Sequence, residues 1–235
     1  MPGYLTQVQA VAVAGVADLQ IRSLLDRQQY ADPLGEAARL GISSAAWPMF
    51  GLLWPSGAQL AAHLALRPVQ GGERILEIGC GLALASLVAH RRGADVTASD
   101  CHPLAAAFLA ENLRLNGLPP LSYRHGQWGA SAETWTPRGA ASASPATALQ
   151  GRFDLVIGSD LLYEPDAGAT LAAFIESHAA PEAEIWVLDP QRGNRPAFHR
   201  QMAAHRFGLT QTNMGQPETA ASAAYRGRLL RYRRG

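Results

Sequence analysis

Lysine is absent from this sequence of 235 residues, and all 20 basic residues are arginine. The 19 acidic residues almost balance them, which leaves a formal net charge of +1 at pH 7. Without a charge excess, no overall field would attract nucleic acid or an anionic membrane. Alanine and glycine are abundant, so we attribute the missing lysine to a GC-rich coding bias and not to function.

Cysteine is scarce too, and long apolar runs are missing. Cys80 and Cys101 are the only cysteines, which excludes a disulfide framework and a cysteine-based zinc cluster. No apolar run approaches the roughly 18 residues that a membrane-spanning helix needs. The apolar stretch at 8–16 has no basic residue before it, so it makes a poor signal peptide. These absences predict a cytoplasmic, monomeric protein without a membrane partner or a metal site.

The sequence after Arg74 alternates short apolar runs with longer segments of helical periodicity. Repeated units of this kind predict an α/β fold with a mainly parallel, doubly wound sheet. Arginine alternates with apolar residues at 226–232, which predicts a partly exposed edge strand. The stretch 129–150 has no periodicity and predicts a surface loop. The expected strands are 74–78, 94–99, 122–125, 153–158, 184–188, 208–213 and 226–232, and the expected helices are 57–66, 83–92, 103–116, 166–178 and 196–205.

The first fifty residues lie outside this alternation. Apolar runs at 8–14 and 19–24 flank a turn and predict a β-hairpin. We therefore expect an N-terminal extension over 1–53 that packs on a main domain over 54–235. Ser56 is the expected N-cap of the first helix of this main domain.

A glycine turn follows the first expected strand of the main domain. It reads Glu77-Ile78-Gly79-Cys80-Gly81 and continues directly into an expected helix. Only glycine lets the backbone pass so close to a ligand at the carboxyl edge of a sheet. Asp100 ends the next strand, where a carboxylate can accept hydrogen bonds from both hydroxyls of a ribose. The turn and its acidic partners together favour a ligand site over a plain strand-to-helix connection.

A dinucleotide is the first ligand to weigh at such a turn. Its fingerprint needs a third glycine at position 84, where this sequence has Leu84. Glu77 would also place negative charge beside the phosphates. A cofactor with a ribose but no phosphate fits better, and a sulfonium that carries an ammonium fits better still.

These residues resemble the first motif of the seven-strand, class I S-adenosylmethionine-dependent methyltransferases, an acidic residue followed by Gly-x-Gly-x-Gly. Ala83 replaces the third glycine, which we expect to affect close packing more than cofactor binding. The likeness covers about 54–232 and implies a seven-stranded Rossmann-like sheet with an antiparallel last strand. Further segments resemble the branch of protein-lysine methyltransferases and proteins once called nicotinamide N-methylases (methyltransferase family 16), namely Trp54-Pro55, Asn112-Leu113-Arg114-Leu115-Asn116-Gly117, Trp128 and Asp160-Leu161-Leu162-Tyr163.

The resemblance implies S-adenosylmethionine as the cofactor and a set of residues around it. Trp54 and Trp128 would line its methionine end and its adenine side, since an indole offers an apolar face to adenine and a π face to a sulfonium. Ordinary burial of two large aromatic residues is the alternative. Cys101 would approach through backbone atoms, and we expect no catalysis by its thiol. The implied cofactor-binding residues are Trp54, Glu77, Gly79, Cys80, Gly81, Asp100, Cys101, Trp128 and Ser159.

Asp160 and Tyr163 are the predicted catalytic residues. Both follow a buried strand, so they lie at the carboxyl edge where α/β proteins bind ligands. An amine with a pKa near 10.4 must lose a proton before it can accept a methyl group, and partial desolvation helps. A carboxylate and a phenol can then orient its lone pair. The alternative is structural, with Asp160 as a helix cap and Tyr163 as packing.

Arginine in the last fifty residues has two interpretations. Asp189-Pro190-Gln191-Arg192-Gly193 resembles an Asp-Pro-Gly-Arg turn of related lysine methyltransferases, and Arg192 either holds an acidic substrate surface or is solvated. The C-terminal arginines suit solubility better than nucleic-acid binding, because no interleaved aromatic platform accompanies them. These are Arg226, Arg228, Arg231, Arg233 and Arg234.

The sequence therefore predicts an S-adenosylmethionine-dependent N-methyltransferase, above all one that methylates lysine side chains of a protein partner. One alternative is a small-molecule amine or pyridine N-methyltransferase, and another is a non-catalytic cofactor-binding module that regulates a partner. A wide, open pocket with an acidic rim would favour protein lysine. A small closed pocket would favour a small molecule, and a blocked path to the sulfonium would favour the non-catalytic module.

Overall fold

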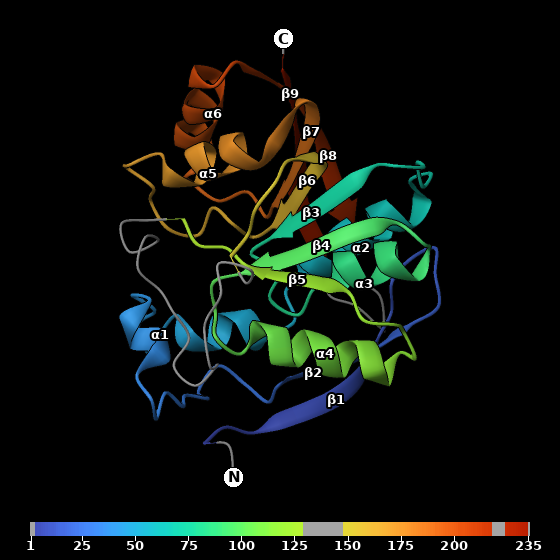
Figure 1. Cartoon of the computed structure of the whole chain (residues 1–235), viewed down its shortest axis with the longest axis vertical. Helices are drawn as coiled ribbons and strands as arrows, with labels where there is room; N and C mark the ends of the chain where they lie inside the picture. The colour runs from blue at the N-terminus through green and yellow to red at the C-terminus, as the bar shows by residue number, and fades with distance from the viewer. Residues whose placement is uncertain (1–2, 129–147, 218–223, 235) are drawn as a thin grey trace.

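The fold is built on a seven-stranded sheet with the order β5-β4-β3-β6-β7-β9-β8 and a separate two-stranded hairpin, β1-β2 (Figure 1). The structure is a computed structural model that describes residues 3–128, 148–217 and 224–234. The strands of the large sheet are β3 Arg74–Ile78, β4 Asp95–Asp100, β5 Ser122–His125, β6 Phe153–Ser159, β7 Ala179–Asp189, β8 Phe207–Gln216 and β9 Tyr225–Arg234.

Strands β3 to β7 run parallel, and the last two strands complete the sheet in antiparallel pairs. Within the large sheet, β3 is the first strand along the sequence. The next strands, β4 and β5, continue towards one edge, and the chain then returns to β6 on the other side of β3. The strand order therefore reverses between β3 and β6, and this reversal is where open α/β sheets bind ligands. The predicted doubly wound sheet with an antiparallel last strand is confirmed.

Apolar residues of the central strands alternate between two hydrophobic clusters, one on each face of the sheet. In β7, Ile185 and Val187 belong to one cluster, whereas Trp186 and Leu188 belong to the other. Strands covered on both faces need this continuous apolar sequence, because successive side chains point to opposite sides. One face is covered by α2 Pro55–Leu66, α3 Leu84–Arg91 and α4 Ala105–Leu115, and the other by α5 Thr170–His178 and α6 Arg195–Ala204.

Several expected boundaries are wrong. The hairpin strands are β1 Thr6–Val11, earlier than the expected 8–14, and β2 Leu19–Leu24. Ser56 is not a helix cap, because α2 already begins at Pro55 and the Ser56 hydroxyl hydrogen-bonds to the Tyr225 hydroxyl at 3.0 Å. The short helices α1 Glu36–Arg39 and η1 Trp47–Gly51 were not expected at all.

Strand β9 is not the edge strand that its alternating arginines predict. It pairs with β7 on one side and β8 on the other, and the exposed strand β8 forms the edge. Four of the arginines are accommodated because their long side chains reach polar or acidic groups on neighbouring elements. Arg233 pairs with Glu184 at 3.0 Å, and Arg234 pairs with Glu176 at 2.7 Å.

Three further expectations concern the loop at 129–150, a membrane-spanning helix and the division of the chain at residue 53. Most of the expected loop at 129–150 lies outside the described residues, which resume at 148. None of the helices in the described parts is long and apolar enough to cross a bilayer. The division of the chain at residue 53 stays a prediction, and one hydrophobic cluster contains residues from both sides of it.

The hairpin lies beside α4 (Figure 1), and two asparagines of this helix bind its strand β2. The Asn112 side chain accepts the Arg22 amide at 2.8 Å, and its own amide donates to the Arg22 carbonyl. One helical turn later, Asn116 accepts the Gln20 amide at 3.0 Å and donates to the Gln20 carbonyl at 2.8 Å. The free edge of β2 is therefore satisfied by side-chain amides, in the way that a third strand would satisfy it. This contact gives the Asn-Leu-Arg-Leu-Asn segment a structural role.

Asn112→Ala should lower the free energy of unfolding by about 1–3 kcal/mol, because the Arg22 amide and carbonyl lose their buried partner. Asn112→Leu restores side-chain volume and should be destabilising too, since a leucine supplies no donor or acceptor. Urea unfolding of both variants measures the loss, with Arg114→Gln on the exposed side of α4 as the control. Wild-type stability in Asn112→Leu would show that packing and not hydrogen bonding attaches the hairpin.

Candidate cofactor and acceptor site

One cavity of about 1070 Å³ opens at the carboxyl edge of β3, β4 and β6, where the strand order reverses. Its volume is at the upper end of the range for small-molecule sites, which leaves space for a cofactor and an acceptor side chain together. The structure brings all of the predicted site residues to this cavity. Its lining includes Trp54, Glu77, Gly79, Cys80, Gly81, Asp100, Cys101, Trp128, Ser159, Asp160 and Tyr163.

Gly79 and Gly81 form the floor of the cavity in left-handed backbone conformations, with φ of 56° and 52°. A Cβ atom at Gly79 would lie 2.7 Å from Leu161 Cδ2, and one at Gly81 would lie 2.8 Å from the Phe50 carbonyl oxygen. Conformation and space both require glycine here. Ala83 also has a positive φ, 58°, as the N-cap of α3. The third position of the motif therefore has a left-handed backbone that favours glycine, and our expectation that alanine affects close packing more than cofactor binding stays a prediction.

Asp100 fixes the shape of this turn. One carboxylate oxygen accepts the Gly81 amide and the other accepts the His102 amide, both at 2.8 Å. Burial raises the pKa of Asp100, although these amides act in the opposite direction. Each carboxylate oxygen can accept a second hydrogen bond, so ribose binding stays a prediction for Asp100.

Glu77 is buried under the turn and is held by α3. Its Oε2 accepts hydrogen bonds from the amide of Ser86, at 2.8 Å, and from the Ser86 hydroxyl. Burial nevertheless raises the pKa of Glu77 to about 7, and the nearby Asp100 adds to this effect. The side chain therefore titrates near neutral pH, and a bound cation close to it would favour its carboxylate form.

The two predicted tryptophans both line the cavity. Trp54 donates its indole hydrogen to the Met49 carbonyl at 2.9 Å, and the Arg27 guanidinium lies 5.7 Å from its ring. Trp128 packs against Phe174 with ring centroids 5.5 Å apart. Both are half-buried and line the cavity, which suits ligand contact better than plain core packing. Their specific contacts with a cofactor stay predictions.

Neither cysteine is activated. Burial raises the pKa of Cys80 and of Cys101 well above the ordinary value, and the Asp100 charge reinforces the shift for both. A thiol that stays protonated is a poor nucleophile. Among the described residues, no three His, Cys, Asp or Glu side chains gather as possible metal ligands.

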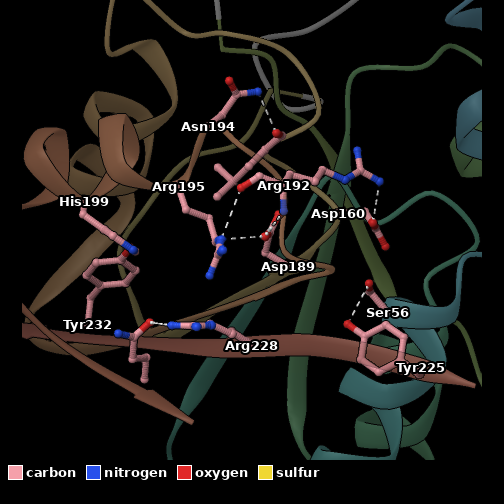
Figure 2. A network of polar contacts seen from close by, with 12 residues as sticks. Ser56, Asp160, Asp189, Arg192, Asn194, Arg195, His199, Tyr225, Arg228 and Tyr232 are labelled. Atoms are coloured by element: carbon pink, nitrogen blue, oxygen red, sulfur yellow. Dashed lines mark hydrogen bonds and ion pairs between the residues drawn. The ribbon is translucent and has the colours of Figure 1, made fainter. Parts of the chain in front are cut away.

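Asp160 and Tyr163 lie in the loop that follows β6. Asp160 has a positive φ of 59°, and its Oδ1 forms an ion pair with Arg192 at 2.7 Å (Figure 2). The alternative role as a helix cap is wrong, because Asp166 caps α5 by accepting the amides of Thr170 and Leu171. Tyr163 is 53% exposed, so it forms part of the rim and not of the packed core.

The sequence missed two parts of the cavity. Arg192 belongs to it as the partner of Asp160, and neither of the roles considered for this arginine included that contact. The segment from Leu40 to Phe50, expected to be a lead-in, forms a wall beside the glycine turn. There Phe50 stacks on His102 with ring centroids 3.6 Å apart. No local pattern identifies these contacts, since they join residues far apart in the chain.

The fold and the position of the cavity define a class of protein, the Rossmann-like methyltransferases. The solved structure of magnesium protoporphyrin IX methyltransferase from Synechocystis PCC 6803 with bound SAM matches with a TM-score of 0.53 and 15% identity, over 77% of this chain and 78% of that chain. At this identity the likeness shows the fold alone. The family described as lysine methyltransferase matches residues 49–203, and this chain belongs to that family.

Several proteins named as methyltransferases are similar in sequence to this chain. Electron transfer flavoprotein beta subunit lysine methyltransferase of Rattus norvegicus is 25% identical over 174 residues, which are 72% of this chain and 60% of that protein. Histone-arginine methyltransferase METTL23 of Rattus norvegicus is 27% identical over 139 residues, 57% of this chain and 56% of that protein. The chain thus spans about 60% of the length of the first of these relatives.

The family implies S-adenosylmethionine as the cofactor, and the cavity fits it. The backbone at Gly79 and Gly81 presents no side chain to a ligand, and the Asp100 carboxylate lies beside it. Glu77 can compensate a positive charge once it ionises. These residues would hold the cofactor at the point where the loop with Asp160 begins.

Asp100→Asn should weaken binding of S-adenosylhomocysteine by about 1–3 kcal/mol, because one of the two acceptor oxygens that serve the turn and a ligand is replaced by a donor. Calorimetry measures the affinity, and Asp95→Asn at the exposed amino end of the same strand is the matched control. Equal affinity in both variants would remove Asp100 from the cofactor site.

Glu77→Gln should change how stability depends on pH. The native protein holds a proton on Glu77 up to about pH 7, whereas the unfolded chain releases it near 4.5. The wild type therefore loses stability as pH rises through this window, by up to about 3 kcal/mol, and Glu77→Gln should not. Urea unfolding at several pH values measures the difference, with exposed Glu182→Gln as the control. Parallel pH profiles for all three proteins would contradict a raised pKa.

Proposed function

We propose that this protein uses S-adenosylmethionine to methylate lysine side chains of a protein partner in the cytoplasm. We call the part of the cavity at Asp160 and Tyr163 the acceptor side. The observation that carries the proposal is the exposed rim on this side. Tyr163 is 53% exposed, and its neighbour Glu164 is exposed as well, although both line the same cavity as the Gly79–Gly81 turn. A side chain that projects from another protein can enter there. Membership of the lysine methyltransferase family supports the same substrate class.

The bound cofactor supplies a methyl group on sulfonium sulfur, which is already activated for displacement. The protein must therefore align a neutral amine with that methyl group, and needs no strong base. Asp160 offers a carboxylate oxygen at the cavity wall. Partial burial raises the pKa of Tyr163 to about 12, so its phenol stays protonated at neutral pH. An acceptor oxygen and a phenol can together fix the direction of the amine lone pair.

The rim also separates this proposal from a small-molecule N-methyltransferase. A small acceptor gains most from a closed pocket that surrounds it. Here the exposed acidic residue Glu164 is part of the cavity lining next to Tyr163. Such a rim suits the cationic end of a lysine side chain during its approach.

Labelled S-adenosylmethionine with a lysate of the host tests the proposal directly. We expect label in the protein fraction, and methyllysine after acid hydrolysis of that fraction. Methylarginine would transfer the assignment to arginine, the substrate named for one relative. Label confined to the small-molecule fraction would overturn the protein substrate.

Asp160→Asn should reduce single-turnover methyl transfer by about 10²-fold or more, because misalignment of the reacting groups costs rate on that scale. Its affinity for S-adenosylhomocysteine should stay within about threefold of wild type, since the glycine turn is untouched. Tyr163→Phe should lower turnover less and leave the melting temperature unchanged, because the ring is largely exposed. Asp95→Asn serves as the control. Full turnover in both variants would exclude this pair from the chemistry.

A further inference from the structure

The Asp160 carboxylate lies on the acceptor side of the cavity, where it forms an ion pair with Arg192. Arg192 Nη2 lies 2.7 Å from Asp160 Oδ1, and both side chains are largely shielded from solvent, at 27% and 12% exposure (Figure 2). The other oxygen, Oδ2, is buried, and the Ser56 hydroxyl lies close enough to the carboxylate to hydrogen-bond with it. One oxygen is thus held by a guanidinium, and Asp160 as a whole lines the cavity.

The position of Arg192 is fixed by a second acidic residue. The Arg192 amide donates to Asp189 Oδ2 at 2.8 Å, and the Arg195 guanidinium lies 3.2 Å from the same oxygen (Figure 2). Asp189 is fully buried at the end of β7. The Asn194 side chain donates to the Leu162 carbonyl at 2.9 Å, which ties the start of α6 to the Asp160 loop. Two carboxylates and two guanidiniums therefore form one fixed network without net charge.

A lone carboxylate at this place would hinder the proposed reaction. An opposite charge within about 4–6 Å stabilises the charged form of a group and can shift its pKa by 1–3 units. An unpaired Asp160 would therefore hold a lysine side chain as an ammonium, which has no lone pair. A carboxylate that is already paired with Arg192 still accepts a hydrogen bond, but its attraction for a cation is compensated.

We propose that Arg192 is a positioning residue that neutralises Asp160, so that the Asp160 carboxylate orients the acceptor amine without holding it as an ammonium. The inference rests on the proposed N-methyltransferase function. The acceptor ammonium first loses a proton to solvent at the open rim. The nitrogen lone pair then forms the bond to the methyl carbon, while the carbon–sulfur bond breaks and its electron pair stays on sulfur.

The other groups that face Asp160 do not disturb this balance. Ser56 lies nearby on α2 and favours the carboxylate, but it is uncharged and bonds to Tyr225. Burial raises the pKa of Tyr225 on β9 to about 12, so it is a neutral phenol at the pH of the reaction, as Tyr163 is. Asp189 is compensated by Arg195. Glu164 is exposed on the rim, where solvent screens it.

The first test is the pH dependence of methyl transfer to lysate protein. Arg192→Gln keeps a hydrogen-bond donor but removes the charge, and it should move the half-maximal rate upward by about one pH unit or more. Arg192→Lys keeps the charge and should restore most of the wild-type profile. Arg114→Gln removes a charge from the exposed side of α4, outside the cavity lining, and should leave the midpoint in place. An unchanged midpoint in Arg192→Gln, or faster transfer by it at pH 7, would overturn the proposal.

The second test needs no turnover and so separates this inference from the proposed function. Binding of n-butylammonium to the S-adenosylhomocysteine complex at pH 7 reports directly on the charge of the acceptor side. Arg192→Gln should bind this cation about tenfold more tightly than the wild type or Arg114→Gln, provided that its melting temperature shows a folded protein. Equal or weaker binding by Arg192→Gln would reject the neutralising role, even if protein methylation is observed. Arg192→Lys, which should bind like the wild type, decides the question if Arg192→Gln does not fold.

Discussion

The hydrogen bond from the Gly81 amide to the Asp100 carboxylate, at 2.8 Å, connects the ends of β3 and β4. A second bond, from the Cys80 amide to the Ser99 carbonyl at 3.0 Å, lies beside it. Together they hold the glycine turn open at the place where the strand order reverses. The cavity wall, the start of α3 and the approach of Phe50 all follow from the course of this turn.

The turn also shows how much backbone strain the fold tolerates. Ala83 adopts a left-handed conformation, which costs an L-residue about 1–2 kcal/mol. Its methyl group is fully buried, and burial of one such group contributes about 0.8 kcal/mol. A glycine would relieve the strain but lose the methyl contact and gain chain entropy in the unfolded state. The effects nearly cancel, which explains why alanine is tolerated at the third position of the motif.

The fold and most of the site were predictable because they depend on local patterns. Continuous apolar strands, helix periods and glycines before α3 each report on their own neighbourhood. What failed depends on contacts across the chain. The Ser56 hydroxyl bonds to Tyr225, 169 positions away, and Arg192 reaches back to Asp160 over 32 positions. No spacing rule distinguishes a solvated loop arginine from one that neutralises a carboxylate in a cavity.

The same reasoning explains why the N-terminal segment was underestimated. It was expected to be an extension because its pattern differs from the βα units that follow. Yet the Phe50 carbonyl lies where a Gly81 side chain would be, and the Phe50 ring stacks on His102 beside Asp100. The hairpin before it is held by Asn112 and Asn116 of α4, which begins a few residues after His102. The segment is therefore anchored at both ends to the elements that carry Asp100, and the cofactor site is built from both parts of the chain.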